Sequence, residues 1–152
     1  MKKTWDPLRL DVRSFARESA TLHGIAALAD MPRLAAEQSA APEGRGAEVS
    51  WTLTGQAKDL RGGAHQTWLL VRAQAQLGLV CQRCLNEMVQ PLTVDRAFRF
   101  VSTEQAADAE DDQSEEDLLV ASTAFDAMTL IEDELILALP LVPRHDSCQP
   151  PA

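Results

Sequence analysis

The stretch Leu69-Leu70-Val71-Arg72-Ala73-Gln74-Ala75-Gln76-Leu77-Gly78-Leu79-Val80-Cys81 decides the fold, because it has the most regular pattern in the 152-residue chain. Apolar side chains occupy every odd position from 69 to 79, while Arg72, Gln74 and Gln76 occupy even positions. Alternation with a period of two predicts a strand with one buried face and one solvent-exposed face. This long strand leads directly into Cys81.

Neighbouring segments predict further strands. Before the long strand, residues 49–53 alternate between apolar and polar side chains, and a turn is expected at residues 61–63. After it, the chain turns near Asn86, and alternation over residues 88–100 predicts a return strand. Residues 118–120 predict one more short strand. The long strand and the return strand should therefore form a central hairpin with the cysteine pair at its tip.

The first forty residues predict short elements. Residues 8–12 alternate and indicate a short strand, after which Ser14 is expected to cap a helix that reaches Ala20. Pro32, just after Asp30, is typical of a helix start, and this second helix should run to about Gln38.

A C-terminal helix is expected between Asp126, a good N-cap, and Pro140, which ends it. The acidic residues 132–134 are expected in its N-terminal half, where the helix dipole favours them. The side chains at helical spacing that should face the sheet are Met128, Ile131, Leu135 and Ala138. Together the elements predict an α+β fold with one domain over residues 1–152. Its antiparallel sheet has a long central hairpin and is packed by the C-terminal helix and the short N-terminal helices.

The negative charge is concentrated in one segment. The net charge is −9, and residues 104–117 hold eight acidic side chains and no basic one, so the remainder carries only −1. An acidic flexible loop is therefore expected at about residues 103–117, either as a solvated loop or as a contact for a basic partner such as a ribosomal protein. The overall charge argues against tight nonspecific RNA binding, which depends on neutralising phosphates.

Composition indicates a soluble cytoplasmic protein. With 45% hydrophobic residues the chain can form a core, and three cysteines are too few for a disulfide framework. The N-terminal lysines have no apolar stretch behind them, so no signal peptide is expected. The longest apolar run, residues 135–139, is too short to cross a bilayer.

The run Cys81-Gln82-Arg83-Cys84 places two thiols at the expected hairpin tip. Near the C-terminus, His145 precedes Cys148 by three residues, so the chain offers four soft or borderline ligands. Tetrahedral zinc accepts thiolate and imidazole ligands, and a tight turn brings two thiolates to one ion. The candidate zinc site is thus made of Cys81, Cys84, His145 and Cys148.

Two other interpretations of the cysteine pair remain open. Redox-active pairs with this spacing usually open a helix, whose N-terminus activates the first thiol, whereas a strand precedes this pair. The thiols could also pack a turn without any metal. The distance from Cys148 to the pair separates these interpretations, because thiolates bind zinc at about 2.3 Å.

Other chemistry is not recognisable in the sequence. There is no phosphate-binding glycine loop, nucleophile elbow or spaced carboxylate pair, so no catalytic residue and no organic cofactor is assigned. Four arginines near the hairpin form either a basic strip that contacts phosphate or ordinary solvated strand faces. These arginines are Arg72, Arg83, Arg96 and Arg99.

Two segments of the chain carry a family resemblance. The first is Cys81-Gln82-Arg83-Cys84 at the end of a long strand, and the second is Ile131-Glu132-Asp133-Glu134-Leu135-Ile136-Leu137-Ala138-Leu139-Pro140-Leu141-Val142-Pro143-Arg144-His145-Asp146, followed by Cys148. In this order, with an acidic insertion between them, they resemble the YceD family of large-subunit ribosomal RNA accumulation proteins. Residues 8–11 and Gly24 are also similar to the family's N-terminal region, so the resemblance covers nearly the whole chain. The positions matching its recurrent motifs are Cys81, Cys84, Pro140, Pro143, His145 and Cys148.

The resemblance implies a non-enzymatic bacterial or organellar factor for synthesis, processing or accumulation of 23S ribosomal RNA. The expected partners are ribosome-assembly or RNA-processing proteins, or a shaped site on pre-23S ribosomal RNA. The alternative function is a small zinc-binding protein-interaction module without a dedicated RNA role. Family members commonly continue with a polar tail after the last cysteine, whereas this sequence ends at Ala152.

Overall fold

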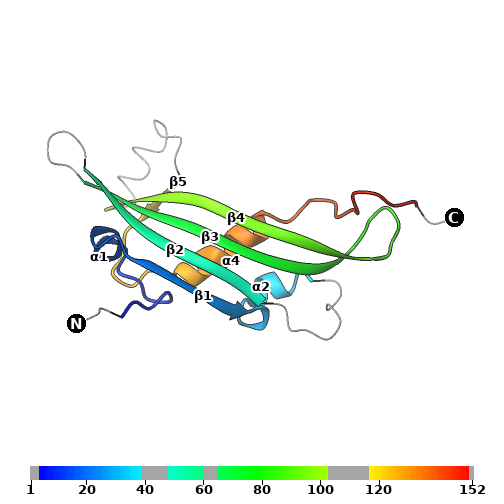
Figure 1. Cartoon of the computed structure of the whole chain (residues 1–152), viewed down its shortest axis with the longest axis horizontal. Helices are drawn as coiled ribbons and strands as arrows, with labels where there is room; N and C mark the ends of the chain where they lie inside the picture. Colours follow the sequence, from blue (N-terminus) through cyan, green and yellow to red (C-terminus); the bar gives the residue numbers. More distant parts are fainter. Residues whose placement is uncertain (1–3, 39–47, 60–64, 103–116, 151–152) are drawn as a thin grey trace. The chain divides into compact units, whose positions relative to one another are not determined.

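The computed structural model describes residues 4–38, 48–59, 65–102 and 117–150. The predicted turn at 61–63 and most of the acidic segment, residues 103–116, lie outside the described residues. The elements in chain order are α1 Val12–Arg17, β1 Thr21–Ala27, the 3-10 helix η1 Leu28–Asp30, α2 Pro32–Ala35, β2 Glu48–Asp59, β3 His65–Val80, β4 Glu87–Val101, β5 Asp117–Val120 and α4 Ala127–Leu137 (Figure 1). Among the described residues, no helix has both the length and the apolar character needed to span a membrane.

The strands form one five-stranded sheet in the order β1-β2-β3-β4-β5. The predicted α+β class is confirmed, but the prediction of an antiparallel sheet is wrong at one edge. Strand β5 pairs in parallel with β4, with Phe98 opposite Asp117 and Val101 opposite Val120. The sheet is therefore mixed. A parallel pair needs a long connection, and residues 102–116 provide one.

The alternation in β3 is confirmed by burial. The six apolar side chains at odd positions from 69 to 79 are buried, whereas Arg72, Gln74 and Gln76 are exposed. The predicted return strand and the strand over residues 118–120 are also present, as β4 and β5. Strands β3 and β4 are neighbours in the sheet, and residues 81–86 join them.

The described contacts divide the chain into two compact units. Unit 1 comprises residues 1–23, 52–72 and 95–130, and unit 2 comprises residues 24–51, 73–94 and 131–152. Strands β1 to β4 and helix α4 contribute residues to both. The four candidate metal ligands all belong to unit 2.

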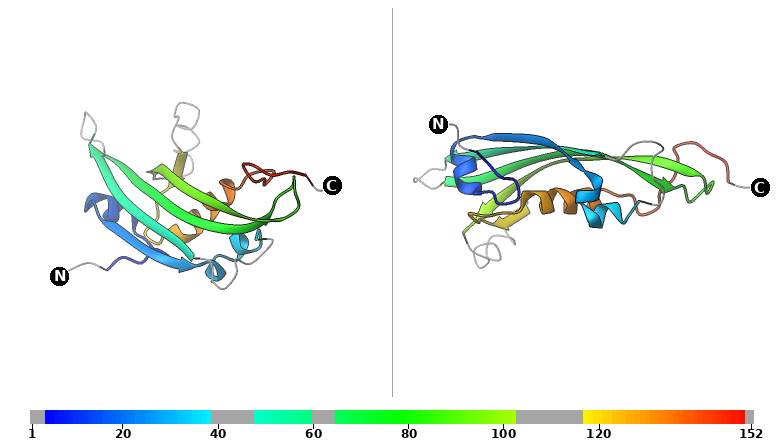
Figure 2. Two further views of the ribbon diagram at one scale, coloured as in Figure 1. Left: turned by 45° about the vertical axis from the view of Figure 1, so that its right-hand side comes forward. Right: turned by 90° about the horizontal axis from the view of Figure 1, so that it is seen from below.

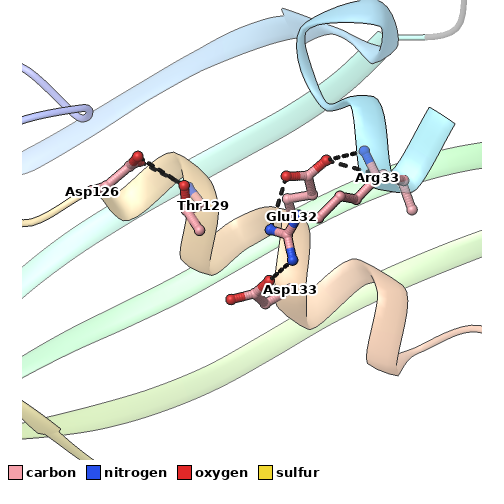
Figure 3. Close-up of polar contacts among 6 residues, drawn as sticks. Arg33, Asp126, Thr129, Glu132 and Asp133 are labelled. Carbon is pink, nitrogen blue, oxygen red and sulfur yellow. Dashed lines mark hydrogen bonds and ion pairs between the residues drawn. The ribbon is translucent and has the colours of Figure 1, made fainter. Parts of the chain in front are cut away.

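In unit 1, α1 begins earlier than the sequence predicted. Asp11, rather than Ser14, is the N-cap, because its carboxylate accepts hydrogen bonds from the backbone N–H and the hydroxyl of Ser14. The expected strand over residues 8–12 is reduced to one bridge, in which Leu10 and Phe125 exchange two backbone hydrogen bonds of 2.8 Å. The predicted N-cap of α4 is confirmed, since Asp126 accepts from the backbone N–H of Thr129 at 2.9 Å (Figure 3).

In unit 2, a buried carboxylate holds the start of α2. Pro32 occupies its first turn as predicted, but the helix ends at Ala35 rather than near Gln38. The Glu132 side chain accepts from the backbone N–H groups of Arg33 and Leu34 at 2.9 and 3.2 Å. It also accepts from the guanidinium of Arg33 at 2.9 Å (Figure 3). Figure 2 shows α2 and α4 on the same face of the sheet. Glu132 therefore caps α2 from a different helix, in place of an N-cap side chain.

The role predicted for the acidic run in α4 is wrong. Residues 132–134 lie in the middle of Ala127–Leu137 rather than in its N-terminal half. The predicted inward face is correct for the burial of Ile131 and Leu135, but Met128 is half-buried and Ala138 is exposed. Glu132 is buried, and its carboxylate accepts from two N–H groups at the start of α2.

The contacts of Glu132 and Asp133 predict different losses of folding stability when each is replaced by its isosteric amide. Glu132→Gln removes one of two buried acceptor oxygens and the charge that binds Arg33, so it should destabilise folding by about 1–3 kcal/mol. Asp133→Asn removes only a half-exposed ion pair with Arg33 and should cost less than about 1 kcal/mol. Urea unfolding of both variants measures the difference. Equal losses of stability would contradict the capping role of Glu132.

Candidate metal centre

The turn between β3 and β4 presents the first two ligands. Cys81 directly follows β3, and Cys84 lies three residues before β4. The turn is closed by two backbone hydrogen bonds, from Cys81 N–H to the Asn86 carbonyl at 2.9 Å and from Leu85 N–H to the Cys81 carbonyl at 2.8 Å. Leu85 has a φ of 64°, a left-handed conformation that costs a leucine free energy. Both thiols are buried in this turn.

The segment after α4 brings the other two ligands to this turn. Pro140 and Pro143 keep it out of helix, and Figure 1 shows it running beside the β3–β4 turn. The backbone N–H of Gln82 donates to the Pro143 carbonyl at 2.8 Å. The backbone N–H of His145 donates to the Cys81 sulfur at 3.3 Å.

The four predicted ligands converge on one point. Their ligand atoms all lie within 4.8 Å of one another. The sulfurs of Cys81 and Cys148 are 3.6 Å apart, and the Cys84 sulfur is 3.3 Å from Nδ1 of His145. Ligand bonds of about 2.3 Å for sulfur and 2.0–2.1 Å for nitrogen place neighbouring tetrahedral ligands roughly 3.5–3.8 Å apart. The separations of 3.6 and 3.3 Å are close to these values, so the four side chains could hold one metal ion.

The electrostatics of the cluster favour a thiolate at Cys81. Burial alone would raise the pKa of this thiol, but N–H groups of Cys84, His145 and Arg83 hydrogen-bond to its sulfur and, with the Cys84 thiol, lower the pKa to about 5. Burial and the neighbouring sulfurs of Cys81 and Cys84 raise the pKa of Cys148 to about 11. A metal ion bound by these sulfurs would displace the remaining thiol protons, because metal ligands must be deprotonated.

The same geometry separates the interpretations of the cysteine pair. A redox-active pair typically opens a helix, whereas the described residues around Cys81 and Cys84 are a strand, a turn and a second strand. If Cys81 and Cys84 only packed the turn, there would be no need for the His145 nitrogen and the Cys148 sulfur to contact them. The donor set of three sulfurs and one nitrogen is a known structural zinc combination. The arrangement therefore favours metal binding.

The arginines noted near the expected hairpin differ in their surroundings. Arg99 is buried, so it belongs neither to an exposed basic strip nor to a solvated strand face, and both interpretations are wrong for this residue. Arg72 is exposed and pairs with Asp95 at 3.4 Å, and Arg96 lies over the ring of Phe98. The sequence analysis did not predict the hydrogen bond from the Gln82 N–H to the Pro143 carbonyl. The proline was the only sign of this contact in the sequence.

The sequence model of the family described as the large ribosomal RNA subunit accumulation protein YceD matches residues 69–152. The match covers more than half of the chain. The chain belongs to the YceD family. The matched YceD region begins within β3 and includes all four ligands of the candidate metal centre. None of the solved structures matches the chain significantly.

The ligand geometry predicts about one zinc ion per chain when the protein is purified without chelators. Cys84→Ser should reduce the bound zinc to less than about a tenth of an equivalent, because the hydroxyl is a poor replacement for a thiolate ligand. The exposed Ser147, which lies between two ligands in the sequence, offers a control, and Ser147→Ala should retain the metal. Elemental analysis with a thiol count measures both. Zinc-free wild-type protein with three intact thiols would contradict the site.

Proposed function

We propose that this protein is a non-enzymatic accessory factor for the synthesis, processing or accumulation of 23S ribosomal RNA in large ribosomal subunit biogenesis. The observation that carries the proposal is the family match, which spans residues 69–152 and is described as a large ribosomal RNA subunit accumulation protein. The candidate metal centre lies wholly inside the matched region, so the two findings concern the same part of the chain.

The metal centre has a structural role in this proposal. Four protein ligands complete the tetrahedral coordination of zinc, and catalytic zinc sites instead keep one position open for water or substrate. A zinc ion bound by Cys81, Cys84, His145 and Cys148 would cross-link the β3–β4 turn to the segment after α4. This arrangement supports a role in binding rather than in catalysis.

The proposed partners are ribosome-assembly or RNA-processing proteins in the cytoplasm. The net charge of −9 makes tight nonspecific RNA binding unfavourable, so a protein contact is the simpler mode of action. Exposed apolar side chains lie on the two segments that the metal centre joins, Leu85 in the turn and Leu141 and Val142 in the C-terminal segment. Apolar side chains at such a fixed point are suited to contact another protein.

Deletion of the gene should lower mature 23S ribosomal RNA relative to 16S ribosomal RNA. Wild-type protein and the Ser147→Ala variant should restore the ratio, whereas Cys84→Ser should not, because the C-terminal segment would lose its anchor. Quantification of both RNAs at several growth temperatures provides the measurement. A ratio that is unchanged on deletion at every temperature would overturn the proposed function.

Co-sedimentation separates this function from that of a zinc-binding interaction module without a dedicated RNA role. A biogenesis factor should migrate with precursors of the large subunit at low salt and dissociate at high salt, since exposed charge contacts are screened. Migration away from all ribosomal particles, with a normal RNA ratio, would favour the alternative module.

A further inference from the structure

A pocket of about 590 Å³ lies in unit 1, away from the four metal ligands in the sequence. It is formed where α1 meets the end of β2, the start of β3 and the end of β4, and Figure 1 shows α1 beside these strand ends. Its volume falls within the range of about 300–1,000 Å³ that is typical of small-ligand sites. The side chains that line it are mostly polar, which indicates a polar ligand.

Two cations line the pocket from α1. Arg13 and Arg17 are four residues apart, so they lie on the same side of the helix, and both are exposed. The guanidinium of Arg13 donates to the hydroxyl of Ser102 at 2.8 Å, which fixes its orientation and leaves further N–H donors. Ser102 itself also lines the pocket.

Three hydroxyl side chains, those of Ser19, Thr67 and Ser102, line the same pocket. Ser19 is unusual because its φ is 49°, in the left-handed region that normally selects glycine. It ends α1 in a two-bond motif: its N–H donates to the Ala16 carbonyl, and Ala20 N–H donates to the Phe15 carbonyl. Glycine is the usual residue at this position, so serine costs stability here. The Ser19 hydroxyl, which lines the pocket, is a functional reason for a serine rather than a glycine at this position.

We propose that this pocket binds the phosphate of a ribonucleotide, either free or as part of an RNA chain. Guanidinium groups pair with phosphate oxygens through two parallel hydrogen bonds, and the hydroxyls supply further donors. Asp59 also lines the pocket, and a carboxylate suits a ribose hydroxyl while it disfavours several phosphates together. A ligand with one phosphate and a ribose therefore matches the lining better than a polyphosphate does.

This proposal goes beyond the proposed function and does not depend on it. The pocket belongs to unit 1, whereas the metal centre belongs to unit 2. The pocket can also be tested with purified protein, so a failure in the binding assay and a failure of the deletion experiment can be told apart. The ribosomal RNA ratio is the readout of the deletion experiment alone and does not enter the binding result.

The test uses the full-length protein, purified without chelators, with adenosine monophosphate, adenosine and a short oligoadenylate as probes in calorimetric titrations. Binding of the monophosphate, of the oligoadenylate or of both supports the proposal, and the stronger of the two identifies the source of the phosphate. Adenosine, which lacks the phosphate, should bind at least about tenfold more weakly, because charged hydrogen bonds contribute most of the affinity. No binding of either phosphate probe, or equal binding of adenosine, would overturn it.

Two substitutions sharpen the test. Arg17→Gln should weaken binding of the phosphate probe by about tenfold or more, whereas Arg9→Gln, an exposed arginine in the same unit outside the pocket, should leave it unchanged. Ser19→Gly should raise the melting temperature and weaken binding, since glycine relieves the backbone cost and removes a hydroxyl. Equal affinities of the Arg17→Gln and Arg9→Gln variants would show that the binding occurs elsewhere and would overturn the proposal.

Discussion

The meeting of four ligand atoms at the β3–β4 turn is the constraint on which the C-terminal part of the molecule depends. The segment after α4 has no regular secondary structure over residues 138–150, so it has no strand or helix ladder to hold it in place. Two backbone hydrogen bonds, to the Pro143 carbonyl and to the Cys81 sulfur, connect it to the turn. The candidate ligand set offers a further connection. A metal ion bound here would add its binding free energy to the folding free energy of this segment, because an unfolded chain has no preformed site.

A second buried polar group stabilises unit 2 in a related way. The carboxylate of Glu132 satisfies the free N–H groups at the start of α2, which has only four residues and no capping side chain of its own. Such a short helix gains little from its own hydrogen bonds and depends on tertiary contacts. The candidate metal ligands and Glu132 thus connect segments far apart in the chain through polar atoms, in addition to buried apolar side chains such as Leu34 and Leu135.

Much of the fold could be predicted from the sequence because burial in a strand repeats every two residues. The odd positions of β3 showed this alternation clearly, and Asp126 was recognised as an N-cap from its place before an apolar helical pattern. The errors arose where distant partners decide the structure. The parallel register of β5 and the burial of Glu132 depend on neighbours that a local pattern does not contain. At α1, only Ser14 was expected as the cap, whereas the Asp11 carboxylate accepts hydrogen bonds from Ser14 and the helix starts earlier.

The ligand identities were predictable, whereas their convergence was not. Thiols spaced as Cys81 and Cys84 indicate a turn that can clamp a metal, but no local pattern places His145 and Cys148 beside that turn. The pocket lined by Arg13 and Arg17 was missed for the same reason, because its lining comes from four separate segments.

The two edges of the sheet differ in a way that bears on self-association. An edge strand exposes unpaired N–H and C=O groups that can template pairing with another chain. Strand β5 spans only Asp117–Val120, which is too short to offer a long ladder. Strand β1 spans Thr21–Ala27 and carries the exposed Ile25, so it is the edge more open to an incoming strand. If this protein forms aggregates when it is concentrated or partly unfolded, they should grow from β1 rather than from β5.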